Sequence, residues 1–198
     1  HRVKNNLALI ESIISLQSQE AQERLEGVAA GTTLDILRDL QSRIDSIRLV
    51  HEKLYSGTAV TEVRVDEYLS ELTDMIIRSM EEADRGIRTD YHIEPVLLTA
   101  KSAVSLGLLV GELVTNSVKY AFSGIEEPGI TVSFSREGAD HLLTVSDNGT
   151  GMDEELLEQR GESLGLRMVQ SLAMQLSGSA EVSNESGTVW RVRFPAEG

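Results

Sequence analysis

The sequence lacks cysteine altogether among its 198 residues. This absence excludes disulfides, thiol nucleophiles and cysteine-ligated metal sites. No apolar run approaches the ~20 residues that a membrane-spanning helix requires, and no basic segment followed by an apolar one indicates a signal peptide. We therefore expect no membrane contact from this part of the protein and a cytoplasmic location, with any membrane segment lying upstream.

Basic residues are also few. The chain has 18 Lys and Arg against 32 Asp and Glu, which gives a formal net charge of −14. Nucleic-acid binding is not expected, because neutralising phosphates requires clustered cations. To bind a smaller polyanion such as a nucleotide, the site itself would have to supply a metal ion, backbone N–H groups or a few well-placed cations.

The first part of the chain shows helical periodicity. Val3, Leu7, Ile10 and Ile14 recur on one helix face. A second helix, which Thr32 or Thr33 can cap, has a largely apolar series with near-heptad spacing from residue 37 to residue 54. Such a helical hairpin has a narrow apolar stripe, so a second copy that completes a four-helix bundle is its natural partner. We predict a dimerisation hairpin over residues 1–57 and a second domain over residues 58–198.

The second domain mixes strands and helices. Alternation predicts strands over 61–65, 87–93, 129–135, 141–146, 180–183 and 188–194, and apolar periodicity predicts helices over 66–82, 102–122 and 164–176. Asp66 is the expected N-cap of the first of these helices. Mixed elements with antiparallel hairpins predict an α+β fold, in which the hairpin is followed by an α/β sandwich with a mixed, mainly antiparallel sheet.

A polar stripe lies on the otherwise apolar helix of residues 102–122. Glu112, Asn116, Lys119 and Tyr120 recur at i, i+4, i+7 and i+8 and so share one face. Two interpretations fit this pattern. Either the stripe faces solvent, or the acid and the amide hold Mg²⁺ while the lysine contacts phosphate.

Three further stretches have the composition of ligand-binding turns. Asp147-Asn148-Gly149-Thr150-Gly151-Met152 follows a strand, where a carboxylate can accept from an exocyclic amine and glycines let the backbone approach a flat ring, although the same letters also suit a plain turn. Ser163-Leu164-Gly165-Leu166 enters a helix, whose N-terminus favours phosphate. Thr188 opens the last strand with a hydroxyl that could complete an adenine pocket. Each of the last two signals is weak alone.

The order and spacing of these stretches carry a resemblance. The chain from about residue 60 to residue 195 resembles the ATP-binding domain of the histidine kinase, Hsp90, gyrase and MutL superfamily. E-L-V-T-N is similar to its N box, D-N-G-T-G-M to its G1 box, S-L-G-L to its G2 box, and G-T-V-W-R-V-R-F-P to its closing strand.

The first residues narrow the resemblance to one branch. H-R-V-K-N-N-L, with the later stretch from Arg43 to Tyr55, resembles the phosphotransfer hairpin of histidine kinases related to the HWE group. The resemblance implies that His1 is the phosphoacceptor and that the phosphoryl group passes to an aspartate of a response-regulator receiver domain. It also implies an upstream sensor domain outside this chain. His51, His92 and His141 are expected to be structural.

The resemblance implies ATP and Mg²⁺ as cofactors and gives roles to the residues of the motifs. Asn116 would ligate Mg²⁺, Glu112 would support the metal or the proton transfer, and Lys119 would contact phosphate. The remaining nucleotide-binding residues would be Tyr120, Asp147, Gly149, Gly151, Met152, Ser163, Leu164, Gly165, Leu166 and Thr188.

The sequence departs from the family pattern in three places. The W-x-E signature of the HWE group is absent, since Trp190 lies in the last predicted strand, which makes the chain a neighbour of that group. Arg2 stands where many histidine kinases have an acid, so the base that accepts the imidazole proton is open between Glu112 and Asn5. The stretch between Met152 and Ser163 is short, which predicts a small lid over the phosphates.

Two other functions remain open on sequence grounds. One is a catalytically degenerate, dimeric scaffold that binds nucleotide, which the missing acid after His1 would permit. The other is an ATPase or serine kinase that uses the same pocket without His1.

The predicted bundle gives a first test. We expect light scattering of the full chain at tens of micromolar to give the mass of a dimer, because the hairpin stripe needs a second copy to cover it. A monomer mass under these conditions would contradict the predicted dimer.

Overall fold

The computed structural model describes residues 62–80, 86–152 and 164–196, with no account of the side chains of residues 164–167. The predicted hairpin of residues 1–57, including His1, and Ser163 of the predicted phosphate turn lie outside the described residues. The boundary at residue 57 therefore stays a prediction.

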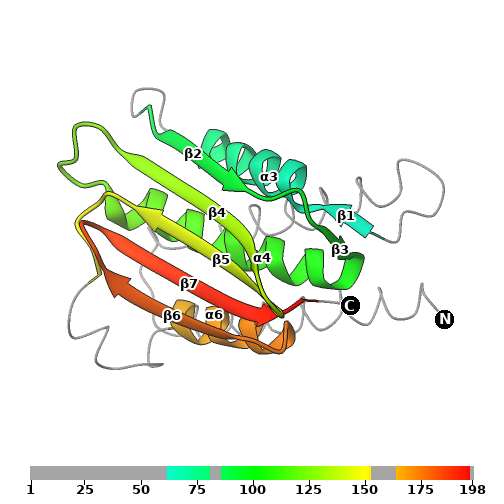
Figure 1. Cartoon of the computed structure of the whole chain (residues 1–198). Helices are drawn as coiled ribbons and strands as arrows, with labels where there is room; N and C mark the ends of the chain where they lie inside the picture. Colours follow the sequence, from blue (N-terminus) through cyan, green and yellow to red (C-terminus); the bar gives the residue numbers. More distant parts are fainter. Residues whose placement is uncertain (1–61, 81–85, 153–163, 197–198) are drawn as a thin grey trace, which may run out of the picture.

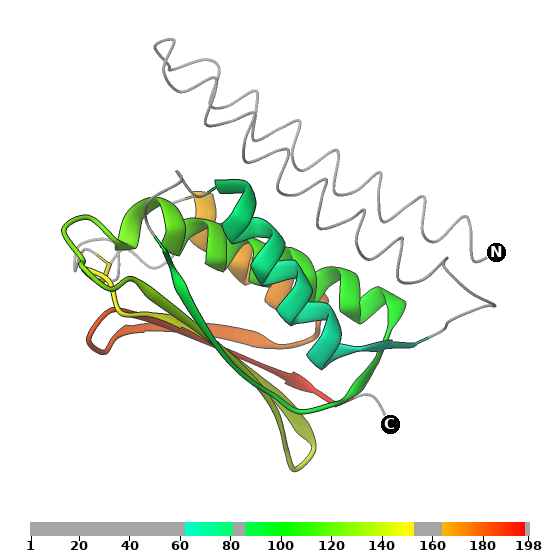
Figure 2. The ribbon, with the colours of Figure 1, turned by 90° about the horizontal axis from the view of Figure 1, so that it is seen from above.

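The described elements form a sheet with helices on one of its faces (Figures 1 and 2). The sheet has the strand order β2-β4-β5-β7-β6. These strands are β2 (Arg88–Ile93), β4 (Gly129–Glu137), β5 (Asp140–Asp147), β7 (Thr188–Pro195) and β6 (Ser179–Asn184). β2 pairs with β4 in parallel and the other neighbours are antiparallel. The predicted α+β class with a mixed, mainly antiparallel sheet is confirmed.

Three helices cover one face of this sheet, namely α3 (Val65–Met80), α4 (Ala100–Asn116) and α6 (Leu164–Gln175). The core fills the space between the two layers, because every second residue of the central strands points toward the helices. The most buried inward side chains of the sheet are Ile130, Val132, Phe134, Leu143, Val145 and Val192. None of the helices in the described ranges is both long enough and apolar enough to cross a membrane.

A small second sheet lies where the chain enters α3. β1 (Glu62–Arg64) pairs antiparallel with β3 (Leu97–Thr99), a strand too short to show the alternation by which strands are predicted. The structure corrects the expected cap of α3. Asp66 lies inside the helix, which begins at Val65, and there its carboxylate complements the positive end of the helix dipole.

The central helix α4 begins earlier than predicted. The Thr99 side chain accepts a hydrogen bond from the N–H of Ser102, at 3.4 Å, so Thr99 is the cap and Ser102 lies within the first turn. After Asn116 the helix continues as one π-helical turn, η1 (Ser117–Ala121). Apolar periodicity predicts a continuous α-helix here. A π-turn contains one residue more than an α-helical turn, which barely changes the spacing of the apolar residues in the sequence.

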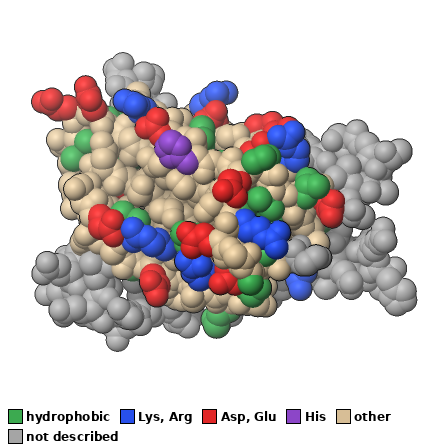
Figure 3. All heavy atoms as spheres, viewed as in Figure 1, with side chains coloured by type: hydrophobic (Ala, Val, Ile, Leu, Met, Phe, Trp, Pro, Cys, Tyr) green, Lys and Arg blue, Asp and Glu red, His purple; other side chains and the backbone are tan. Residues whose placement is uncertain are grey.

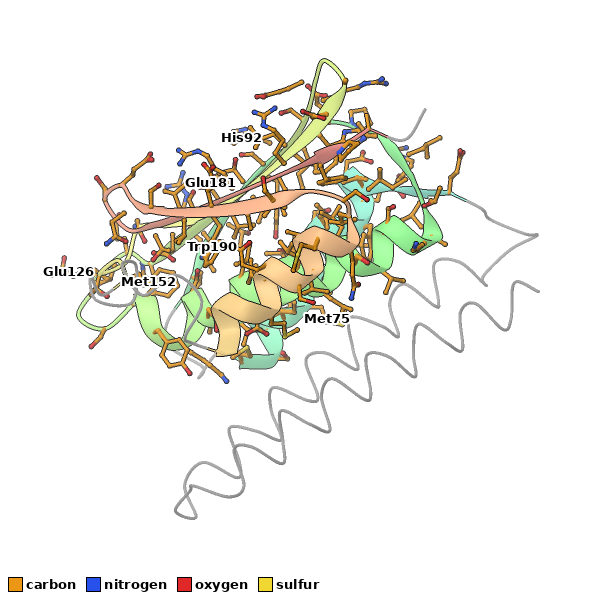
Figure 4. The ribbon with its side chains drawn as sticks, turned by 90° about the horizontal axis from the view of Figure 1, so that it is seen from below. Met75, His92, Glu126, Met152, Glu181 and Trp190 are labelled. Atoms are coloured by element: carbon orange, nitrogen blue, oxygen red, sulfur yellow. The ribbon has the colours of Figure 1, made fainter. Side chains whose placement is uncertain are left out.

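The sheet face that looks away from the helices is open (Figure 3). Its centre carries the partly exposed hydroxyl side chains of Thr131, Ser133, Thr144 and Ser146. Charged residues surround them, and Figure 4 shows His92 and Glu181 on this side, opposite Trp190. His92 and His141 lie in strands as predicted. The imidazole of His141 is buried against the Phe134 ring, at 5.1 Å between centroids.

Helices α3 and α4 cross closely at one glycine. The fully buried ring of Tyr68 lies over Gly107, and a Cβ at Gly107 would overlap the Tyr68 hydroxyl. Burial raises the pKa of Tyr68. Among the described residues the hydroxyl has no hydrogen-bond partner. The crossing therefore depends on the small size of residue 107.

This crossing predicts the effect of one added methyl group. Gly107→Ala should lower the free energy of unfolding by about 1–3 kcal/mol, because the tightly packed ring has to move. In a Tyr68→Phe background the same change should cost less, since the overlapping oxygen is gone. Urea unfolding of the four variants measures both effects, and equal losses in the two backgrounds would contradict the proposed overlap.

Candidate functional site

The carboxylate of Asp147 is the centre of the site. Asp147 is the last residue of β5 and its side chain is 6% exposed. Its Oδ1 accepts from the N–H of Gly149 at 3.1 Å and from the N–H of Thr188 at 3.0 Å, and its Oδ2 accepts from Ser117 Oγ at 2.8 Å. A carboxylate has about four acceptor positions. Donors from the described residues use three of them, which leaves capacity for one more donor.

The π-helical turn brings Ser117 to this carboxylate. Ser117 is the first residue of η1 and is buried, and it directly follows Asn116, the last residue of α4. A π-turn adds a residue to the helix and changes which side chains share a face. Such turns are frequent at functional sites. Here the turn points a hydroxyl from the helix layer toward the end of the sheet.

The loop after Asp147 is fixed against η1. The N–H of Thr150 donates to the carbonyl of Ala121 at 2.9 Å. A Cβ at Gly149 would overlap that same carbonyl, so only glycine permits the close approach. Asn148 connects the loop to the start of β4, because its Oδ1 accepts from the N–H of Gly129 and its Nδ2 donates to the carbonyl of Glu127, both at 2.8 Å.

The far end of the loop reaches strand β6. Gly151 has φ +78, a left-handed conformation that glycine adopts readily. Met152 is partly buried and packs against the core, and Figure 4 shows it at the same end of the fold as Glu126. The Asn184 side chain bonds to both backbone groups of Met152.

The predicted polar stripe is divided between buried and exposed positions. Glu112 is 9% exposed, Asn116 and Lys119 are partly buried, and Tyr120 is 70% exposed. The interpretation in which the whole stripe faces solvent therefore does not hold for Glu112. Within the described ranges no three His, Asp or Glu side chains gather closely enough to hold a metal ion by themselves.

The remaining predicted residues lie at the ends of elements. Thr188 is buried at the start of β7, and its backbone N–H donates to Asp147 Oδ1. Leu164, Gly165 and Leu166 are the first residues of α6, as expected for a turn that enters a helix. The structure thus brings Asp147, Gly149 and Thr188 together with η1.

Family models match most of the chain. One described as histidine kinase matches residues 1–80, and one described as histidine kinase-, DNA gyrase B-, and HSP90-like ATPase matches residues 101–198. The chain belongs to the histidine kinases. Its two matched segments are those of a sensor histidine kinase core.

Curated relatives of this histidine kinase align along nearly its whole length. It is 30% identical over 199 residues to the sensor histidine kinase PdtaS of Mycobacterium tuberculosis, covering 98% of this chain and 38% of PdtaS. It is 27% identical over 201 residues to the blue-light-activated histidine kinase 2 of Erythrobacter litoralis, covering 98% of this chain and 55% of the relative. The chain thus spans about half the length of these relatives or less.

A solved structure shares the fold of this histidine kinase. The histidine kinase domain of the Erythrobacter litoralis EL346 blue-light activated histidine kinase superposes with a TM-score of 0.73 at 24% sequence identity. The match covers 96% of this chain and 85% of that one. At this identity the likeness is one of fold.

Sequence reasoning did not identify Ser117 or Asn184. Ser117 is adjacent to the predicted Asn116, but an α-helix would turn it away from the stripe, and the π-turn has no clear pattern in the sequence. Asn184 stands at the end of a strand in a polar stretch, where asparagine is ordinary. Both act through partners that are 30 or more residues away.

The contact between Ser117 and Asp147 predicts a stability effect. Ser117→Ala should lower the free energy of unfolding by about 1–3 kcal/mol, because a buried carboxylate loses one of its donors. Ser79→Ala is the matched control, since Ser79 is an exposed residue whose hydroxyl donates, among the described residues, to the carbonyl of Ile76 in its own helix. Urea unfolding that gave equal losses for both variants would contradict this role.

Proposed function

We propose that this chain is the kinase core of a two-component system. It binds ATP at the Asp147 site, transfers the γ-phosphoryl group to His1, and donates it to an aspartate of a response-regulator receiver domain. The observation that carries the proposal is the buried Asp147 carboxylate, which three donors hold while one acceptor position remains. The family match of both segments supports it.

The spare acceptor position suits an adenine base. The exocyclic amine of adenine donates a hydrogen bond, which a carboxylate fixed in one orientation accepts without reorganising. Gly149 lets the loop backbone pack directly on Ala121 of η1, which keeps the loop in place beside the carboxylate. Met152 and Thr188 border the same end of the sheet, and Tyr120 offers an exposed aromatic ring.

The described residues fit a magnesium ion that arrives with the nucleotide. Mg²⁺ takes oxygen ligands and usually keeps one or two protein ligands together with phosphates and waters. Asn116 and Glu112 lie one helical turn apart on α4 and supply one amide and one carboxylate, which is too few for an all-protein site. The ion would neutralise phosphate charge, while Lys119 and the N-terminus of α6 at Gly165 would contact the phosphates.

His1 is the proposed nucleophile and lies outside the described residues. A neutral imidazole, with an ordinary pKa near ~6.5, offers a lone pair at cytoplasmic pH. A ring nitrogen of His1 bonds to the γ-phosphorus, the bond from that phosphorus to the bridging oxygen breaks, and ADP leaves. The imidazole proton passes to a base, for which the carboxylate of Glu112 is the candidate.

The proposal includes the assembly of the chain. The hairpin of residues 1–57 would form the homodimer, and residues 58–198 would form the ATP-binding domain. An upstream sensor domain would control the core in the cytoplasm. Because the chain spans about half of its relatives or less, the input signal of the whole protein lies beyond this proposal.

Labelling with γ-labelled ATP and Mg²⁺ tests the proposal. We expect acid-labile, alkali-stable label on the native chain, because a phosphoramidate is the product, and at least a hundred-fold less label on His1→Gln. His92→Gln is the matched control, since His92 is an exposed histidine on the open sheet face.

The other outcomes separate the alternatives. Nucleotide binding without any label would indicate the scaffold. Acid-stable label, or phosphate release that persists in His1→Gln, would indicate the serine kinase or ATPase. Label that survives His1→Gln in acid-labile form would overturn the assignment of His1.

A further inference from the structure

Asn184 bonds to both backbone polar groups of Met152, its N–H and its carbonyl. Its Nδ2 donates to the Met152 carbonyl at 2.8 Å, and its Oδ1 accepts from the Met152 N–H at 2.9 Å. A side-chain amide carries one acceptor and donors in a planar group, so it can pair with a backbone as a neighbouring strand would. One side chain thus replaces a short piece of sheet at the end of β6.

The tip of the β6–β7 hairpin places Asn184 beside the Asp147 site. Asn184 is opposite Thr188 in the strand register, and Thr188 is the residue whose N–H donates to Asp147. The turn between them is tight, with Gly187 at φ +133, and a Cβ at Gly187 would overlap the backbone carbonyl of Asp147. The same hairpin tip therefore contacts both ends of the loop 147–152.

The middle of that loop is held from the opposite side. The N–H of Thr150 donates to Ala121 of η1, and Gly149 packs on the same carbonyl. Gly151, in its left-handed conformation, comes next, and a Cβ there would lie 3.1 Å from Asn184 Oδ1. Thus the backbone from Gly149 to Met152 runs between η1 and Asn184, and it has little freedom on either side.

We infer that Asn184 is a positioning residue for the nucleotide site. Its two hydrogen bonds fix the backbone of Gly151 and Met152. This backbone determines the shape of the loop, and the loop and Asp147 together would form the proposed base pocket. The inference rests on the proposed function, because it is the nucleotide that makes the loop shape matter. Asn184 acts through Met152 and need not touch the ligand.

Loss of the clamp should appear as loss of affinity and of base selectivity. We expect Asn184→Ala to weaken ADP binding about ten-fold, because two hydrogen bonds that order the loop are lost. Asn184→Asp keeps the acceptor for the Met152 N–H but replaces the donor with an oxygen that faces the Met152 carbonyl, so it should weaken binding as well. GDP, which lacks the matching amine, should be affected less, and the ratio of the ADP and GDP affinities should fall.

Calorimetric titration of the full chain with ADP and with GDP makes the test. Ser179→Ala is the matched control, because Ser179 is an exposed polar residue at the other end of β6. Hydrogen exchange of the Met152 amide supplies a second readout, which should become faster in Asn184→Ala while the unfolding midpoint changes little. A general loss of structure would lower that midpoint without changing the ratio of the two affinities.

The outcomes for this inference and for the proposed function can be told apart. If the native chain binds ADP and Asn184→Ala binds it equally well, the inference is overturned and the proposed function stays in place. If the native chain does not bind ADP at all, the proposed function is overturned and the inference with it. If Asn184→Ala does not fold, the same comparison between Asn184→Asp and Ser179→Ala decides.

Discussion

The buried carboxylate of Asp147 is the interaction on which the site depends. Burying an ionised group is costly unless hydrogen bonds replace the water that it loses. Here three donors do so, and they come from the helix layer, from the loop after β5 and from the start of β7. The carboxylate therefore fixes three segments relative to one another, and any movement of one would leave a buried charge with fewer partners.

The surrounding contacts extend this constraint along the loop. Ala121 holds Thr150 from the side of η1, Asn148 holds the loop to β4, and Asn184 holds Met152 from the side of β6. A binding site is effective when its ligand finds the groups already in place, because little ordering is left to oppose association. Here the loop backbone is held by the Ala121 carbonyl and by the side chains of Asn148 and Asn184. Such local order suits the proposed nucleotide site, because a net charge of −14 offers no general attraction for a nucleotide.

The chain belongs to the histidine kinases, and the phosphoryl transfer that histidine kinases catalyse depends on positioning. Phosphoryl transfer asks the protein mainly to align nucleophile and leaving group and to stabilise charge on the transferred oxygens. In the proposed mechanism the described domain would supply the nucleotide half of this alignment. The other half would belong to His1, at the opposite end of the chain from the motifs proposed to bind ATP.

The sequence by itself determined the elements and the family. Periodicity and alternation depend on local hydrogen bonds and one buried face, so α3, α6 and the strands of the main sheet were predictable, and the D-N-G-T-G-M stretch placed Asp147 at a strand end. The tertiary structure decided the π-turn at Ser117, the strand β3, the cap at Thr99 and the clamp at Asn184. Ser117 and Asp147 are separated by 30 residues, and Met152 and Asn184 by 32. Such pairs lie outside any local window, and only the packing of the helix layer on the sheet brings them into hydrogen-bonding distance.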